Sequence, residues 1–207
     1  ETDALGDTTI SAGTIRTTGT QRYNDAVSLG GNLTAEGAGI RFASIDGAST
    51  LTINDSGATE LLGTVGGTIA LTSLQTDATG STTLGANITT VGAQSFLDAV
   101  VISADLTLNG TTLTLDKTVE SSQSGDPLAS DFSSLTVVGD AVFGDDMGAA
   151  ARLGALTITG DTDLGGSVST RDNQAFGDNS ANTLTLTANG VELDADIALD
   201  PRKGVFL

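Results

Sequence analysis

Hydrophobic residues alternate with threonine or another polar residue in many short segments of this chain. The clearest of these segments are 50–54, 68–71, 105–109, 112–115, 155–159 and 183–187. A period of two over a few residues, bounded by turns rich in Gly, Asn and Asp, predicts β-strands. No stretch of eleven or more residues shows a helical period. We therefore expect an all-β chain.

The spacing of these segments indicates how the strands are arranged. They recur about every 6 to 10 residues, so three strands would form a coil of about 18 to 25 residues, as in a parallel β-solenoid. An antiparallel sandwich is the alternative. Sandwiches do not need a long internal repeat, however, and they usually place large aromatic residues in the core. The pattern therefore favours the parallel β-solenoid.

A motif of glutamine, an aromatic residue and aspartate, each separated by one residue, occurs three times. The copies are Gln21, Tyr23 and Asp25; Gln94, Phe96 and Asp98; and Gln174, Phe176 and Asp178. The glutamines are 73 and 80 residues apart, and "ETDALGDTTI" at 1–10 matches "QTDATGSTTL" at 75–84. We expect one solenoid segment over 1–207, an excerpt of a longer repeat array. Its units would be 1–74, 75–156 and a partial 157–207, each of three to four coils, with an inserted loop at 120–131.

The position of the glutamine within its segment suggests a structural role for the motif. Ile88, Thr90, Gln94 and Phe96 share one parity, so in an unbroken strand Gln94 points to the apolar side. A buried amide needs hydrogen-bond partners, and the backbone of a tight turn is nearest. We predict a corner joint in which the glutamines bind turn backbone, the aromatic rings fill the core and the aspartates close the following turn. Successive copies would lie about 14 to 19 Å apart along the axis and could not touch.

Composition excludes several classes of function. The chain has no Cys and no His, which removes thiol nucleophiles, disulfides and histidine-based catalysis, and leaves no usual zinc ligand set. Its net charge of -18, with eight Lys and Arg, argues against nucleic-acid binding and against an anionic membrane surface. No apolar run approaches the roughly 18 residues that span a bilayer, so we expect no membrane insertion.

Acidic residues are the remaining candidates for chemistry. Some β-helical proteins cleave acidic polysaccharides with clustered carboxylates, arginine and calcium. Here the residues of that kind are Asp161, Asp163, Asp194, Asp196 and Arg171. We place these aspartates in short turns where water screens them, so we expect no catalytic residue, no enzyme and no cofactor. Calcium-binding repeat patterns are absent. Weak calcium binding by scattered aspartates stays open, and no metal ligand is assigned.

Two longer strings resemble a known family. The string at 17–34 reads T-T-G-x-Q-x-Y-x-D-A-V-x-L-G-x-x-L-T, and "TVGGTIALTSL" stands at 64–74. They resemble the repeats of large secreted bacterial adhesins of the filamentous haemagglutinin type, which are two-partner secretion exoproteins and related proteins. The third copy, "RDNQAFGDNSANTL", departs from the pattern because it lacks the Gly before Gln and the Ala-Val after Asp.

The resemblance implies a right-handed parallel β-helix in an extracellular or bacterial cell-surface protein that serves adhesion or a biofilm matrix. A stalk or fibre segment of an adhesin is the first expectation. The alternative is a subunit of a self-assembling filament whose ends stack on each other. The implied partners are neighbouring repeats or identical subunits end to end, and the sequence names no receptor.

Overall fold

The computed structural model describes residues 1–11, 13–122, 132–177, 184–186 and 197–198 of the chain. These residues form strands and turns, with no helix among them. The first ten strands are β1 (Asp7–Ile10), β2 (Gly13–Arg16), β3 (Gln21–Leu29), β4 (Leu33–Gly37), β5 (Ile40–Asp46), β6 (Thr50–Asp55), β7 (Ala58–Leu61), β8 (Ser73–Thr76), β9 (Ser81–Leu84) and β10 (Ile88–Thr89). The others are β11 (Gln94–Phe96), β12 (Ala99–Ile102), β13 (Leu106–Leu115), β14 (Val119–Ser121), β15 (Leu135–Phe143), β16 (Leu156–Ile158), β17 (Thr162–Leu164), β18 (Gln174–Phe176), β19 (Leu184–Leu186) and β20 (Ile197–Ala198).

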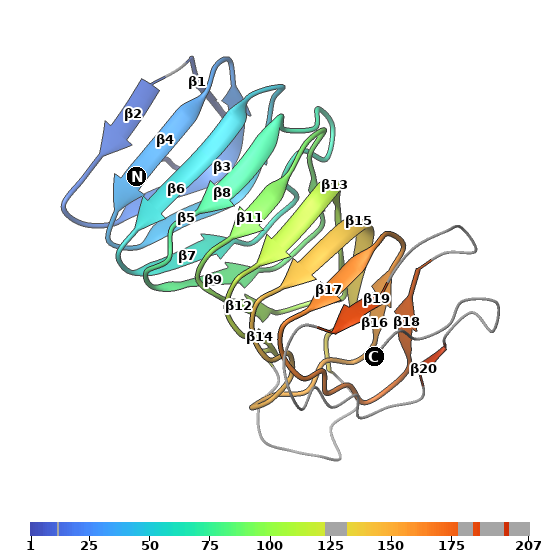
Figure 1. The fold of residues 1–207 in the computed structure, drawn as a ribbon. Helices are drawn as coiled ribbons and strands as arrows, with labels where there is room; N and C mark the ends of the chain where they lie inside the picture. Colours follow the sequence, from blue (N-terminus) through green and yellow to red (C-terminus); the bar gives the residue numbers. More distant parts are fainter. Residues whose placement is uncertain (12, 123–131, 178–183, 187–196, 199–207) are drawn as a thin grey trace.

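The strands lie on top of one another in three parallel stacks, one for each side of the coil. Stack A contains Leu33, Leu51, Leu74, Gln94, Leu113, Ala141 and Thr162 in register. Stack B contains Gln21, Ile40, Thr59, Thr82, Val100 and Val119. Stack C contains Val27, Ile45, Val65, Ile88, Leu108, Val137 and Ile158. The predicted parallel β-solenoid is confirmed, with about eight coils stacked from the N-terminal end onward (Figure 1).

Alternation of side chains explains why these segments form the coils. In β6, Leu51, Ile53 and Asp55 face inward and are buried, while the threonines and Asn54 between them face outward. Inward residues of one coil pack on those of the next, about 4.8 Å away, so small branched side chains fill the interior in layers. The buried hydrophobic residues form one continuous cluster from Ile10 to Phe176.

Coil length varies where a loop is inserted at a corner. Leu33 pairs with Leu51, whereas Leu51 pairs with Leu74, so this coil is longer by about five residues. The extra residues lie between Val65 and Leu71. The strand predicted at 68–71 is therefore wrong. Of its residues only Leu71 forms a bridge, and the exposed Ile69 lies on a loop.

The loop predicted at 120–131 also needs a correction. Glu120 and Ser121 belong to β14 and pair with Val101 and Ile102, so the insertion begins after them. Residues 123–131 lie outside the described part of the chain. Several strands also bend around a corner and continue into the next stack. β13, for example, joins the two predicted strands 105–109 and 112–115, with a break in register between Asn109 and Thr112.

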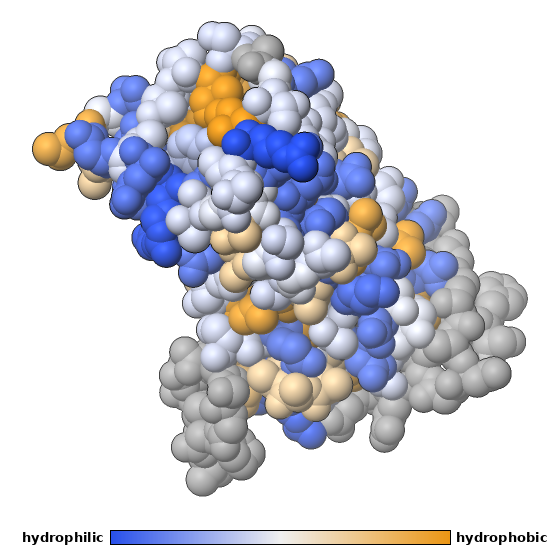
Figure 2. All heavy atoms as spheres, turned by 90° about the vertical axis from the view of Figure 1, so that its left-hand side faces the viewer, coloured by the Kyte–Doolittle hydropathy of each residue, from blue (hydrophilic) through white to orange (hydrophobic). Residues whose placement is uncertain are grey.

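The outer surface is largely polar. On the face shown in Figure 2, apolar side chains form small separate patches surrounded by hydrophilic ones. Within the described residues, no helix is long and apolar enough to cross a membrane.

Candidate functional site

The three repeated glutamines are buried at corners of the coil. Gln94 illustrates their bonding. Its Nε2 donates to the backbone oxygen of Asn109 in the next coil at 2.9 Å and lies 3.4 Å from Oγ1 of Thr90. A longer contact of 3.5 Å reaches the backbone oxygen of Ile88. The amide therefore ties the turn that precedes it to the following coil.

The other two copies repeat the bonds within the turn, and Gln21 also reaches the next coil. Gln21 Nε2 donates to Glu36 O at 2.6 Å, Ile15 O at 3.2 Å and Thr17 Oγ1 at 3.3 Å. Gln174 Nε2 donates to Thr170 Oγ1 at 3.2 Å and Val168 O at 3.4 Å. The glutamines thus lie inward and bind backbone, where the parity of the sequence places them.

A threonine four residues before each glutamine closes the turn itself. The Oγ1 hydroxyls of Thr17, Thr90 and Thr170 donate to the backbone oxygens of Gly19, Gly92 and Asp172, each at 2.7 Å. The corner joint therefore consists of a threonine that closes the turn, a glutamine that fixes the turn to the solenoid and the aromatic ring that follows.

The aromatic residue differs between the copies. Tyr23 stacks on Phe42, with ring centroids 4.7 Å apart, and its hydroxyl donates to Gln21 Oε1 at 3.0 Å. Phe96 and Phe176 are buried at the equivalent positions but carry no hydroxyl. Among the described residues, Oε1 of Gln94 and of Gln174 is buried without a hydrogen-bond partner. The later two joints therefore leave a buried acceptor unpaired.

The aspartate of the motif reaches backwards along the chain and does not close the following turn. Asp98 accepts hydrogen bonds from the hydroxyls of Thr76 and Thr82, both at 2.7 Å. Asp25 accepts from Thr8 at 2.6 Å and from Thr2. Each carboxylate therefore ties its own coil to the preceding one. Asp178 lies outside the described residues, so its role stays a prediction.

The two aspartates differ in environment although their partners match. Burial is the main influence on Asp98 and raises its pKa above the ordinary 3.8, against the lowering effect of the two hydroxyls. The pKa of Asp25 is lowered, first by the hydrogen bond from Thr2 and then by that from Thr8. In Asp25 the two hydrogen bonds outweigh burial, which alone would raise the pKa.

The three joints lie on three different sides of the solenoid. Gln21 is in stack B, Gln94 in stack A and Gln174 in stack C. From Gln21, the chain passes stack B at Ile40, Thr59 and Thr82, and then moves on by two sides, through stack C at Ile88 to stack A at Gln94. The path from Gln94 to Gln174 likewise takes three coils and two further sides. Three coils and two sides are one side short of four full coils. Each copy of the joint is therefore displaced around the solenoid axis by one side relative to the copy before it.

A second corner recurs with the same rotation, and the sequence analysis missed it. Asp46 Oδ1 accepts the backbone N–H groups of Thr68 and Ile69 at 2.8 and 3.0 Å. Glu120 accepts those of Ala150 and Ala151, the latter at 2.6 Å. The loops "VGGTIAL" at 65–71 and "MGAAARL" at 147–153 are equivalent, since both begin and end on isolated parallel bridges. The sequence signal that could have revealed this second corner is an acidic residue in one coil followed by a loop of this kind in the next coil.

Asp55 is another structural carboxylate that was not anticipated. It is almost fully buried and accepts from the backbone N–H groups of Gly39 at 2.6 Å, Ile40 at 2.7 Å and Gly57 at 3.0 Å. The hydroxyl of Thr59 also lies 3.2 Å from it. Both carboxylate oxygens of Asp55 therefore accept hydrogen bonds that hold a turn, and this explains the burial of the side chain.

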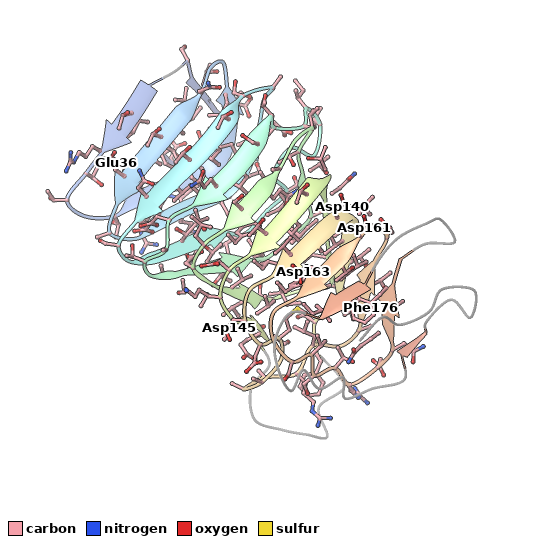
Figure 3. The ribbon with its side chains drawn as sticks, in the orientation of Figure 1. Glu36, Asp140, Asp145, Asp161, Asp163 and Phe176 are labelled. Atoms are coloured by element: carbon pink, nitrogen blue, oxygen red, sulfur yellow. The ribbon has the colours of Figure 1, made fainter. Side chains whose placement is uncertain are left out.

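Of the four aspartates considered for catalysis, the structure describes Asp161 and Asp163. Asp163 lies in β17, not in the expected turn, while Asp161 stands at the preceding corner and donates its backbone N–H to Asp140 (Figure 3). Arg171 lies on an exposed turn, and Asp194 and Asp196 lie outside the described residues. Within the described part of the chain, no group of three or more Asp or Glu could hold a metal ion.

Comparisons of the chain with protein-family models, curated proteins and solved structures found no match.

Proposed function

We propose that this chain is a non-enzymatic structural segment, a stalk or fibre, of a large extracellular or bacterial cell-surface adhesin, with right-handed coils. The observation that carries the proposal is that the repeated polar residues hold coils to one another. Gln94 and Asp98 are buried, and each bonds to atoms of a neighbouring coil. A group repeated for display to a ligand would instead face solvent.

The rotation of the joint supports a load-bearing role. The joint on stack B ties neighbouring coils through Gln21 and Glu36, and the joint on stack A ties them through Gln94 and Asn109. Ties on more than one side of the solenoid resist bending in more than one direction. The continuous core from Ile10 to Phe176 adds to this stiffness, because close-packed protein interiors have low compressibility.

The test is the removal of one whole repeat. Deletion of residues 94–173 joins residue 93 to Gln174 and keeps the joint sequence. We expect this deletion to shorten the rod by about 18 Å, or three and two-thirds coils at about 4.8 Å each. In the adhesin on its cell, receptor binding at the tip should persist at a shorter reach, measured by electron microscopy and cell-adhesion assays. Loss of binding with a folded, surface-exposed stalk would contradict the proposal.

The alternative is a subunit that stacks end to end into a filament. In the described chain β1 and β2 each pair on one side only, and such a strand edge can pair with a further coil, from a second copy or from the same protein. Ile15, half-buried at this end, offers a test, because an inward charge blocks pairing at an edge. If the chain forms oligomers by sedimentation, Ile15→Lys should abolish them while the outward Thr14→Lys does not. A monomer at all concentrations favours the stalk.

A further inference from the structure

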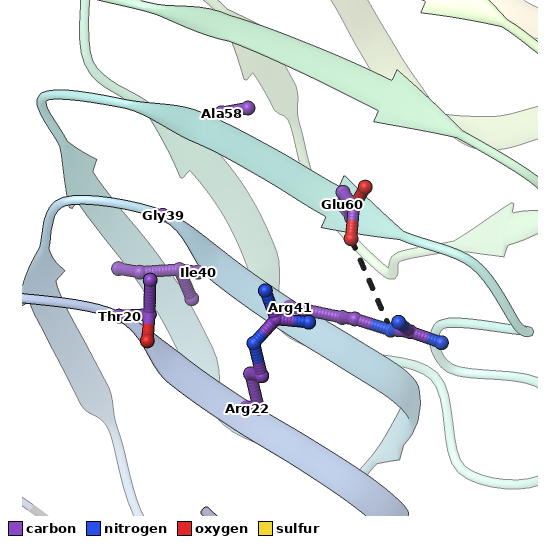
Figure 4. A pocket seen from close by; sticks show the side chains of 7 residues that line it. All are labelled: Thr20, Arg22, Gly39, Ile40, Arg41, Ala58 and Glu60. Carbon is purple, nitrogen blue, oxygen red and sulfur yellow. Dashed lines mark ion pairs between the residues drawn. The ribbon is translucent and has the colours of Figure 1, made fainter.

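A small hollow lies on the outer side of stack B, across β3, β5 and β7 (Figure 4). Its volume is about 140 Å³, and it opens to solvent. The residues that line it are Thr20, Arg22, Gly39, Ile40, Arg41, Ala58 and Glu60. None of them belongs to the corner joints.

The charges around the hollow are not balanced. Arg22, Arg41 and Glu60 face outward in register on successive coils. Like charges directly opposite one another on paired strands are destabilising. Arg41 Nε lies 3.9 Å from Glu60 Oε2, which is too long for a hydrogen bond. Arg22 has no carboxylate within ion-pair distance among the described residues. Of the two guanidinium groups, only that of Arg41 therefore has a carboxylate within ion-pair distance, on a chain of net charge -18.

The shape of the hollow indicates what can enter it. Gly39 and Ala58 leave its floor without long side chains, so a flat group can approach the backbone. Arg22 and Arg41 form one wall, with Glu60 beyond Arg41 (Figure 4). The Thr20 methyl faces Gly39, and the Glu60 carboxylate adds a hydrogen-bonding group suited to the hydroxyls of a ligand (Figure 4).

We propose that this hollow binds a sugar residue that carries a single carboxylate. The carboxylate would lie between the Arg22 and Arg41 guanidinium groups, whose planar donors match it, and the ring would cover Gly39 and Ala58. A densely charged polyanion fits less well, because the surrounding protein is strongly acidic and repels it. The partner is therefore a glycan with isolated acidic residues. This inference does not depend on the segment being a stalk.

The experiment is a titration of the purified chain with glucuronate, glucose, acetate and an acidic dipeptide, followed by NMR chemical shifts. We expect glucuronate to shift signals of residues around the hollow and to bind at least about tenfold more tightly than acetate, while glucose has no effect. Arg22→Ala and Arg41→Ala should each weaken glucuronate binding about tenfold. Glu60→Gln should strengthen it about threefold, because Glu60 competes for Arg41.

Arg16→Ala is the matched control. Arg16 is exposed on stack A and already pairs with Glu36 at 3.3 Å, so its loss should leave glucuronate binding unchanged. If Arg16→Ala weakened glucuronate binding as much as Arg22→Ala does, the attraction would be non-specific and the proposed site would be wrong. Equal affinity for acetate and glucuronate would contradict the proposal that the ligand is a sugar. Tighter binding of the dipeptide than of glucuronate would show that the hollow prefers peptides. Absence of any shift would overturn the whole proposal.

Discussion

The hydroxyl of Tyr23 donates a 3.0 Å hydrogen bond to Oε1 of Gln21, and this bond distinguishes the first corner joint from the later two. Phe96 and Phe176 leave the corresponding acceptors of Gln94 and Gln174 without a partner among the described residues. An unpaired buried acceptor costs about 1 to 3 kcal/mol of stability, so the three joints are not equally strong.

Exchange of the two ring types should transfer this hydrogen bond between joints. We expect Tyr23→Phe to lower the free energy of unfolding by about 1 kcal/mol, because it leaves Gln21 Oε1 unpaired. Phe96→Tyr should raise it by a similar amount by supplying a donor to Gln94. Urea unfolding of both variants measures the change. A loss of stability in Phe96→Tyr would show that the core there has no space for the hydroxyl.

The amide of Gln94 should be essential to its joint. We expect Gln94→Ala to cost about 1 to 3 kcal/mol, because the amide bonds to Asn109 O and Thr90 Oγ1 are lost, although the Thr90 backbone N–H still donates to Asn109 O. Gln94→Glu should cost more near neutral pH, because a carboxylate would face the backbone oxygens of Ile88 and Asn109 without a donor. Lowering the pH should partly restore the free energy of unfolding of Gln94→Glu, because the new carboxylate becomes protonated. Gln75→Glu, on the exposed face of β8, is the control and should be nearly neutral at both pH values.

The two buried aspartates should respond to pH in opposite ways. The pKa of Asp98 is raised in the folded state, so its protonation favours folding, and its contribution to stability grows as pH falls through that pKa. The pKa of Asp25 is lowered, so its contribution is present above 3.8 and is lost as pH falls through the folded value.

Asparagine substitutions test this contrast. Asp98→Asn resembles the protonated acid and should raise the free energy of unfolding near neutral pH, with the difference closing as the solution is acidified. Asp25→Asn should lower it near neutral pH, with the difference again closing in acid. Urea unfolding from about pH 7 to about pH 3 gives both curves. Parallel curves for wild type and both variants would refute the assignment.

Local patterns in the sequence were sufficient to predict the fold and the inward glutamines. Threonine alternating with Leu or Ile marks a strand with one buried face, and Gln94 shares the parity of its apolar neighbours. The same reasoning failed at 68–71, where "TIAL" has the alternation of a strand. There Asp46 binds two consecutive backbone N–H groups and holds the segment as a loop. A contact from the preceding coil overrides the local pattern.

Relations between coils were not predictable from one sequence. The repeat of 73 to 80 residues is visible in the sequence. How many sides of the solenoid one repeat passes through depends on loops such as 66–70, and the length of such a loop does not reveal whether it contains a strand. The rotation of the joint by one side was therefore missed. The partners of Asp98 were missed for the same reason, because Thr76 and Thr82 lie 22 and 16 residues away.

Glycine should be irreplaceable at the loop that follows Val65. Gly66 has φ of +67°, and a Cβ there would lie 2.1 Å from the backbone oxygen of Thr89. We expect Gly66→Ala to cost at least about 1 to 3 kcal/mol from backbone strain, and the close contact should add to this. Gly19→Ala is the control, since a Cβ there meets no atom within 4 Å and φ is not positive. Thermal or urea unfolding should leave the control close to wild type.

Spin labels can test the rotation of the repeat directly, because the chain contains no cysteine. Arg22 and Val101 face outward on stack B, four coils apart, so labels at these positions should lie about 19 Å apart plus the reach of the linkers. Ser95 lies at nearly the same height as Val101 but on stack A. The pair at 22 and 95 should therefore show a clearly longer distance than the pair at 22 and 101, because its vector also crosses the body of the solenoid. Equal distances for the two pairs would place the joints on one side and contradict the rotation.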